Sequence, residues 1–351
     1  MSNPAEKNDN VNKELKKFSL WEINRELADR EKNIAIEPQS DGPSRTSPTA
    51  NTRSSRRIGI AGFNTSELHD AKKSRQKVIY GVDNRQDYYQ LDEQSESKIK
   101  EQCGSVVSLF NNDDLVPVQT DGGQKFSLGT SKFGEAYGLC EQEVFFNQPV
   151  GAFCSGFLVA DDLVATAGHC VTEDDVTNVS FVFGYRMNSE NQAQTTISSS
   201  EIYHGKELVG RKLTDDGTDW ALVRLDRTVE NHKPFKIRRD GKIKDQQRVY
   251  VIGHPCGLPL KYAAGSRVRN NQEESYFVAN LDTFGGNSGS CVFHAGDETD
   301  LENGIVEGIL VRGETDFDDI NGCKRSNVCP DDKCRGEDCT RTTEFAHLVP
   351  E

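Results

Sequence analysis

The sequence predicts an all-β protein, because short apolar runs alternate with turn residues through most of the chain. From Val78 onward the runs are rich in Val, Ile and Phe, and Gly, Asp and Asn separate them: SVVSLF, GAFCSGFLVA, LVATAG, VSFVFGY, DWALVRL, RVYVIG, YFVANL, SCVFHAG and GIVEGILVRG. No long helical period interrupts the series. Many short strands at close spacing are typical of a β-sandwich or a β-barrel.

Residues 1–77 lack this pattern of apolar runs. Their composition predicts a largely disordered, low-order N-terminal segment. They contain the run SDGPSRTSPTANTRSSRR, which is typical of a linker, and the basic cluster AKKSRQK, which ends at Lys77. Two later stretches are also irregular. Residues 111–149 form a weakly patterned insertion, and residues 312–343 form a loop rich in Cys, Asp and Gly.

The amino-acid composition limits which classes of partner and which cellular compartment we expect for this protein. The formal net charge is −14, whereas a nucleic-acid binder more often presents a basic face. No stretch approaches the roughly 20 apolar residues that span a bilayer. We expect protein or peptide partners, no nucleic acid, no membrane and a monomer. Ten cysteines favour a secreted or periplasmic location, but residues 1–30 show no secretory signal, so a cytoplasmic location is the alternative.

Three segments offer the groups that a hydrolytic serine needs: a hydroxyl, a base, a carboxylate that orients the base, and donors for the oxyanion. His169 follows a strand-like run in LVATAGHCV, and Asp219 precedes one in TDWALVRL. Ser288 lies in the Gly-rich turn DTFGGNSGSCVF. The backbone amides of Gly286 and Ser288 in such a turn can point at one place and form an oxyanion hole.

Each segment also has an ordinary structural interpretation. His169 taken alone is a turn histidine, and GNSG taken alone is a hairpin loop. Asp219 taken alone is a surface acid or a helix cap, and Asp215 and Asp216 compete with it. The string Thr-Ala-Gly-His-Cys around His169 favours a catalytic role for this histidine over a purely structural one.

The strings TAGHC, DWALVRL and GGNSGS, in that order, resemble the chymotrypsin–trypsin superfamily of serine endopeptidases. His169, Asp219 and Ser288 stand 50 and 69 positions apart, which suits a triad shared by two barrels. GNSGS in place of GDSGG, together with KVIYGVDNRQD, resembles the bacterial glutamyl-endopeptidase subgroup. The resemblance covers about residues 78–316.

This resemblance implies a trypsin-like fold of two six-stranded antiparallel β-barrels with the active site in the cleft. The first barrel is expected at about 78–235 and the second at about 236–316, with a Cys-rich extension over 317–351. His169 would act as general base and acid, Asp219 would orient it, and Ser288 would form the acyl-enzyme. Gly286 and Ser288 would bind the oxyanion. We expect no cofactor and no metal.

The resemblance also suggests a primary specificity pocket. The residue six positions before the nucleophile lies at its base, and here that residue is Asp282. Leu310 stands where glutamyl endopeptidases carry a pocket His, Thr283 matches their pocket Thr, and Val311 and Gly313 complete the lining. A buried carboxylate attracts Arg or Lys and repels Glu, so we expect cleavage after Arg or Lys. Preference for Glu, or an Asp282 that turns away to cap a loop, is the alternative.

Activation departs from the trypsin pattern. Trypsins place an Asp before the nucleophile to pair with the freed N-terminus, and here that position is Asn287. The bacterial subgroup also has Asn there and still matures by cleavage. We therefore expect a zymogen with a processing site at Lys77–Val78 and residues 1–77 as propeptide.

The cysteines give one clear pairing and several open ones. A Cys154–Cys170 disulfide would staple the His169 turn to the preceding strand. Cys256 and Cys291 either form a bridge or remain buried thiols. The tail has the spacing C-x5-C-x4-C-x4-C, which fits a zinc site poorly and favours disulfides or thiols.

Two other functions remain open at this stage. One is a catalytically inactive homologue that acts as a binding module. The other is an intracellular processing enzyme of narrow selectivity.

Overall fold

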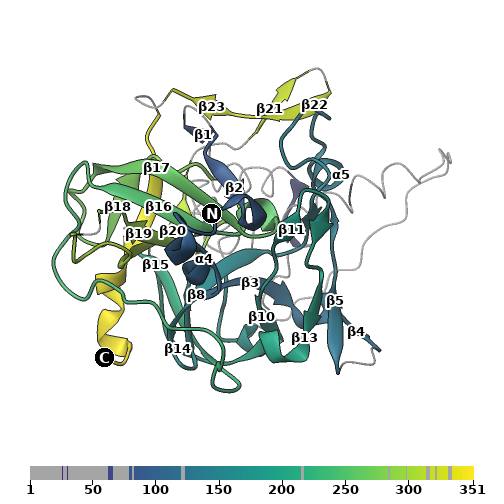
Figure 1. Cartoon of the computed structure of the whole chain (residues 1–351), viewed down its shortest axis with the longest axis horizontal. Helices are drawn as coiled ribbons and strands as arrows, with labels where there is room; N and C mark the ends of the chain where they lie inside the picture. Colours follow the sequence, from purple (N-terminus) through teal and green to yellow (C-terminus); the bar gives the residue numbers. More distant parts are fainter. Residues whose placement is uncertain are drawn as a thin grey trace, which may run out of the picture.

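The computed structural model describes residues 26, 30, 62–65, 79–80, 83–119, 123–214, 217–283, 285–297, 299–313, 317–320, 322–330 and 334–351 (Figure 1). Most of the expected N-terminal segment, including Lys77 and Val78, lies outside these residues. Asp215 and Asp216 lie outside them too.

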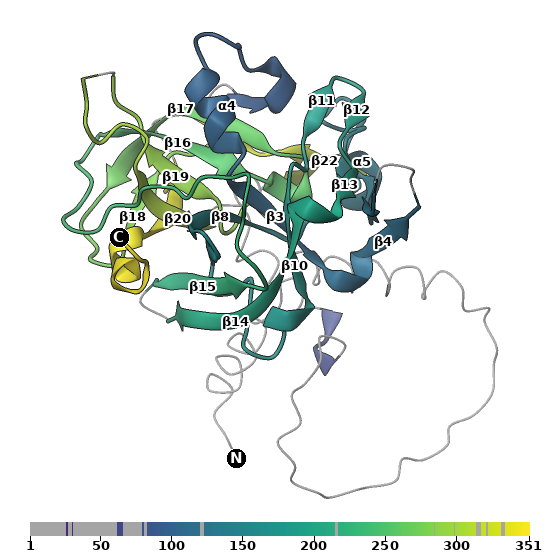
Figure 2. The same cartoon turned by 60° about the horizontal axis from the view of Figure 1, so that its bottom comes forward.

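Six antiparallel strands close into a first barrel. Around the ring they follow the order β3, β8, β9, β15, β14, β10. Their bounds are Val106–Asn111, Cys154–Ala160, Leu163–Thr166, Asp219–Leu225, Ile202–Leu213 and Val179–Phe183. Figure 2 shows β14 and β15 side by side along the lower edge.

A second ring of six antiparallel strands follows the order β16, β19, β20, β24, β18, β17, and β17 pairs back with β16. Their bounds are Arg248–Gly253, Cys291–His294, Val306–Arg312, Glu337–Arg341, Tyr276–Ala279 and Lys261–Asn270. The early strand β2 (Arg85–Asp87) pairs with β17 from outside the ring. The two closed barrels confirm the predicted fold class.

The expected end of the second barrel at residue 316 is wrong. Strand β24, Glu337–Arg341, lies between β18 and β20 and closes the ring. The sequence EDCTR is polar, yet all five residues are buried, so it lacks the apolar pattern that marks a core strand. Residues 317–351 therefore supply a core strand of the barrel and are not simply an extension.

Around the barrels, the structure also describes the following smaller elements within residues 79–351. The helices are α4 (Ser97–Cys103) and α5 (Phe133–Tyr137). The short strands are β1 (Ile79–Tyr80), β4 (Leu115–Val118), β5 (Lys125–Leu128), β6 (Ser131–Lys132), β7 (Pro149–Val150), β11 (Met187–Ser189), β12 (Gln192–Ala193), β13 (Thr196–Ser198), β21 (Phe317–Ile320), β22 (Cys323–Ser326) and β23 (Val328–Cys329). The 3₁₀ turns are η2 (Tyr88–Gln90), η3 (Asn112–Asp114), η4 (Val176–Asn178), η5 (Ser199–Glu201), η6 (Pro255–Gly257), η7 (Thr342–Glu344) and η8 (Ala346–Leu348).

One apolar cluster continues from the first barrel into the second. It includes Phe157 of β8 and Phe293 of β19, both fully buried. Phe235, in the connection between the barrels, packs on both rings, at 6.2 Å from Phe157 and 5.0 Å from Phe293 between centroids. The barrels are thus packed against each other through a shared core, which fixes the position of one relative to the other.

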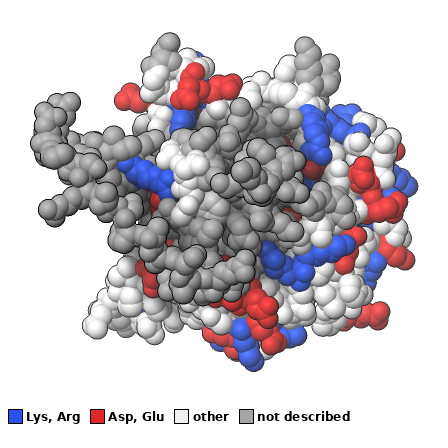
Figure 3. Space-filling view, turned by 180° about the vertical axis from the view of Figure 1, so that it is seen from behind, with Lys and Arg blue, Asp and Glu red and all other residues white. Residues whose placement is uncertain are grey.

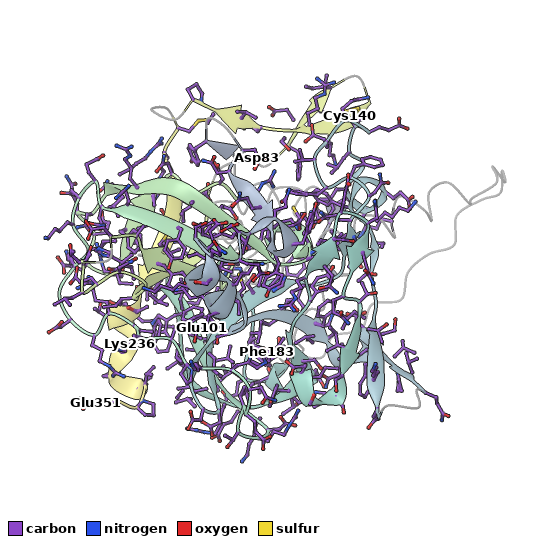
Figure 4. All side chains as sticks on the ribbon, in the orientation of Figure 1. Asp83, Glu101, Cys140, Phe183, Lys236 and Glu351 are labelled. Atoms are coloured by element: carbon purple, nitrogen blue, oxygen red, sulfur yellow. A yellow bond between two sulfur atoms is a disulfide. The ribbon has the colours of Figure 1, made fainter. Side chains whose placement is uncertain are left out.

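A disulfide joins the two irregular stretches seen in the sequence. Cys140 pairs with Cys323, 183 positions along the chain, and Cys140 lies at the upper edge of the molecule beside β22 (Figure 4). Backbone hydrogen bonds reinforce the contact, with Lys324 N–H donating to the Gly138 carbonyl at 2.9 Å. The insertion and the Cys-rich loop therefore form one unit beside the barrels.

The remaining cysteines do not gather into a metal site. Cys329 pairs with Cys334, and Cys339 is a buried thiol of β24. Cys256 and Cys291 are buried thiols and not a bridge. The four tail cysteines are thus split between two disulfides and one thiol.

Charged side chains of both signs are interspersed over the described part of the face in Figure 3. No helix within the described ranges is long and apolar enough to cross a membrane.

Candidate active site

The register of β9 and β15 brings His169 and Asp219 together. Thr166 ends β9 and pairs with Ala221 of the antiparallel strand β15. His169 follows three residues after Thr166, and Asp219 precedes Ala221 by two, so both lie at the same end of the pair. Gly168 permits the tight turn, because a Cβ there would lie 2.8 Å from the Trp220 carbonyl oxygen.

His169 and Asp219 form a buried, doubly bonded pair. The Nδ1 atom of His169 lies 2.7 Å from Oδ2 of Asp219, and the His169 backbone N–H donates to Oδ1 at 3.0 Å. Burial acts to raise the pKa of Asp219, but the contacts with His169 and the nearby Arg312 hold it below its ordinary value. Asp219 is therefore a carboxylate at neutral pH, and it favours the tautomer with a proton on Nδ1.

Ser288 comes from the second barrel but is anchored on the first. The Ser155 backbone N–H of β8 donates to the Ser288 carbonyl at 2.8 Å. Gly289 has a φ of +90°, and a Cβ there would lie 1.9 Å from the Ser155 carbonyl oxygen. The Cys154–Cys170 disulfide ties the same end of β8 to the His169 turn. The nucleophile and the base therefore meet on one common support.

The three triad residues differ in solvent exposure. The carboxylate is the most buried, and the base and the nucleophile, which must meet the substrate, are slightly more exposed. Asp219 is 2% exposed, whereas His169 and Ser288 are 9% and 7% exposed. The Ser288 hydroxyl donates to the Val311 carbonyl at 3.4 Å, and within the described residues it makes no hydrogen bond with the imidazole. Such contacts are often loose before a substrate binds.

Two backbone amides beside Ser288 are poised for an anion. The Gly285 carbonyl accepts a 2.6 Å hydrogen bond from Cys256 N–H. Because this peptide is trans, the Gly286 N–H points the opposite way. Among the described residues, neither Gly286 N–H nor Ser288 N–H has a hydrogen-bond acceptor. Paired donors of this kind are what an oxyanion hole requires.

Asn287 is held by neutral partners. Its Oδ1 accepts from Ser290 Oγ at 2.6 Å, and its Nδ2 donates to Thr283 Oγ1. Asn287 is 2% exposed. The turn thus has internal hydrogen bonds where trypsins use an ion pair, and the Thr283 hydroxyl is occupied by this contact.

Asp282 caps the backbone near β1. Its Oδ1 accepts from Tyr80 N–H at 2.7 Å and its Oδ2 from Asn84 N–H at 3.0 Å. Burial raises the pKa of Asp282 to about 6, and the two amide hydrogen bonds oppose that rise. This geometry matches the alternative in which Asp282 caps a loop, but the carboxylate is still mostly charged at pH 7.

Glu337 is a residue that the sequence analysis missed. It opens β24, is fully buried, and pairs with Ala279 of β18, three residues before Asp282. Its carboxylate lies against Gly313, where a Cβ would come within 1.7 Å of Oε2. The sequence analysis would have identified Glu337 only by assigning RGEDCTR to a strand of the barrel. Glu337 adds a second buried carboxylate beside the expected pocket.

Two groups of side chains approach each other closely enough to suggest a metal. In the first, the sulfur atoms of Cys154 and Cys170 are joined to each other, so His169 has no thiolate partners there. In the second, Glu307 is bound by His294 at 2.9 Å and by Arg238 at 2.5 Å. An arginine in that position supplies the positive charge, so the cluster is an ion-pair network.

Comparison with known proteins agrees with this geometry. Residues 154–299 match the family model described as a trypsin-like peptidase domain, a range that includes all three triad positions. No curated protein shows a match to the chain. A solved structure described as "Structure of Glu endopeptidase in complex with MPD" matches with 15% identity and a TM-score of 0.42, covering 78% of this chain and 97% of that one.

The contact between His169 and Asp219 predicts that the rate at which an uncharged fluorophosphonate labels Ser288 depends on the Asp219 carboxylate. Asp219→Asn should slow labelling on the order of 10³- to 10⁴-fold, because the amide favours the wrong imidazole tautomer. Asp226→Asn, at a half-exposed carboxylate of the same barrel, should leave the rate unchanged. Labelling is followed by mass spectrometry. Equal rates for both variants would contradict the assigned role of Asp219.

Proposed function

Because this chain carries a trypsin-like peptidase domain and is a serine-type endopeptidase, we propose that it cleaves protein or peptide substrates after Arg or Lys. The observation that carries the catalytic part is the 2.7 Å contact between His169 Nδ1 and Asp219 Oδ2, with Ser288 held beside it by the first barrel. We also propose that it acts as a monomer, without nucleic-acid or membrane partners.

The proposed reaction has two halves, acylation of Ser288 and hydrolysis of the acyl-enzyme, and both use His169 and the amides of the oxyanion site. Ser288 rotates from Val311 toward the imidazole, and its Oγ attacks the substrate carbonyl carbon while Nε2 of His169 takes the hydroxyl proton. The oxygen of the tetrahedral intermediate accepts from the amides of Gly286 and Ser288. The C–N bond then breaks, and His169 returns the proton to the leaving amine. Water repeats these steps on the acyl-enzyme and releases the acid.

Two buried carboxylates support the proposed preference for a basic residue. Asp282 and Glu337 are 2% and 0% exposed, and the carboxyl group of Glu337 lies against Gly313 of the expected pocket. A cation that binds beside an ionised carboxylate in a low-dielectric region is attracted to it, whereas a glutamate side chain is repelled. Leu310, at the position of the acid-reading histidine, is fully buried and apolar. The Val311 backbone carbonyl lies next to the nucleophile and accepts from the Ser288 hydroxyl at 3.4 Å.

Processing at Lys77–Val78 is part of the same proposal. Tyr80 follows the proposed cut by two residues, and its N–H is bound by Asp282. The backbone just after the cut is thereby attached to the second barrel. A protease that prefers Lys or Arg could make this cut itself.

Specificity is tested with matched substrates that carry Arg, its uncharged isostere citrulline, or Glu at the cleaved position. Wild type should prefer Arg over citrulline by at least about tenfold in kcat/KM, or roughly 1.4 kcal/mol. Glu337→Gln should lower the Arg value and leave the citrulline value unchanged, and Ser288→Ala should be inactive on all three. A preference for Glu would overturn the proposed specificity, and inactivity on every substrate would indicate a binding module.

The raised pKa of Asp282 predicts a pH dependence of that discrimination. Above pH 6 the carboxyl is ionised and attracts Arg, and below pH 6 it takes up a proton and this attraction is lost. The Arg-to-citrulline ratio of kcat/KM should therefore fall between pH 7.5 and pH 5. The ratio cancels the titration of groups that act equally on both substrates. A ratio that stays constant over this range would exclude Asp282 from the pocket.

Processing is tested by N-terminal sequencing of the purified active enzyme, which should begin at Val78. If the enzyme cuts itself, Ser288→Ala should retain residues 1–77, and added wild type should remove them. An active enzyme that begins upstream of residue 70 would rule out this processing site.

A further inference from the structure

We propose that Tyr137, which lies in the insertion outside both barrels, is a positioning residue for the oxyanion site. Its hydroxyl holds the η6 turn in the conformation that orients the Gly285–Gly286 peptide. The inference rests on the proposed function, because it assigns a role to Tyr137 in that same reaction.

The first link is a hydrogen bond from the insertion to the turn. Tyr137 Oη donates to the Cys256 carbonyl at 3.1 Å. Cys256 has a φ of +54°, a left-handed conformation that residues with a Cβ seldom adopt. Such a conformation persists only where surrounding contacts hold it. The Tyr137 hydroxyl is one of those contacts.

The second link runs from the same residue to the oxyanion site. Cys256 N–H donates to the Gly285 carbonyl at 2.6 Å. Gly286, with a φ of +82°, packs on the Cys256 backbone, where a Cβ would lie 3.2 Å from Cys256 Cα. If Cys256 relaxed, the Gly285 carbonyl would lose its donor, and the peptide could turn so that its carbonyl and not the Gly286 N–H faced the substrate oxygen.

Tyr137 is itself firmly placed. It ends helix α5, and its ring lies 5.1 Å from the Phe133 ring and 6.1 Å from the Phe317 ring of β21. The Cys140–Cys323 disulfide closes the same unit just beyond Tyr137. The insertion and the Cys-rich loop thus present the hydroxyl on a rigid support.

The decisive experiment compares Tyr137→Phe with Tyr250→Phe on a cleavable peptide amide. Tyr250 is the control, because its hydroxyl is also hydrogen-bonded, to Gln102 at 2.9 Å, but lies buried in the core away from the η6 turn. Tyr137→Phe should lower kcat roughly tenfold with KM unchanged, a fraction of the loss seen when an oxyanion donor is removed. It should weaken binding of a peptide aldehyde, whose adduct carries the oxyanion, by the same factor.

A double-mutant cycle separates positioning from simple support of the fold. Glycine adopts a positive φ without strain, so in the Cys256→Gly background Tyr137→Phe should cost much less in kcat than in wild type. An undiminished cost in that background would contradict the proposal, as would a kcat for Tyr137→Phe equal to that of Tyr250→Phe. If Tyr137→Phe fails to fold, Phe317→Leu loosens the ring but keeps the hydroxyl, and it should lower kcat without changing KM.

These outcomes are distinguishable from failure of the proposed function. If wild type neither cleaves peptides nor reacts with a fluorophosphonate at Ser288, the proposed function fails. If wild type is active, Ser288→Ala is inactive and Tyr137→Phe behaves as wild type, only the positioning role fails.

Discussion

The hydrogen bond from the Ser155 N–H to the Ser288 carbonyl, at 2.8 Å, is the contact on which the site depends. It joins the nucleophile turn of the second barrel to strand β8 of the first. The Ser155 carbonyl in turn accepts from Thr166 Oγ1 at 2.7 Å, three residues before His169. Only glycine fits at position 289 against this strand. Base and nucleophile therefore share one support, although their strands belong to different barrels.

Beside this contact, neutral hydrogen bonds hold the nucleophile turn in place, whereas trypsins use an ion pair there. Asn287 bonds to Ser290 and Thr283 inside the turn, and Cys256 bonds to the Gly285 carbonyl. Asp219 places a carboxylate behind the imidazole, and Glu337 places a carboxyl group against Gly313. The carboxylate of Asp219 thus lies where a protonated imidazole is stabilised by it.

The strands that the sequence predicted are those with an apolar, β-branched or aromatic pattern, such as β3, β8 and β16. Strand β14 escaped prediction because it is long and half-exposed, and β24 because its buried residues are polar. In β24, Thr340 accepts from the Asp219 N–H and Asp338 pairs with Arg312. Polar groups that find partners only in the tertiary fold leave no hydrophobic pattern to read.

For this protein the sequence alone determined the fold class, the triad candidates and the Cys154–Cys170 pairing, since each depends on short strings whose residues act locally. The tertiary structure decided what depends on distant partners. It showed that Asp282 accepts hydrogen bonds from the Tyr80 and Asn84 amides, that Glu337 lies against Gly313, and that Cys140 pairs with Cys323. The physical reason is that a buried polar side chain takes its role from the groups that satisfy it, and chain folding alone brings those groups together.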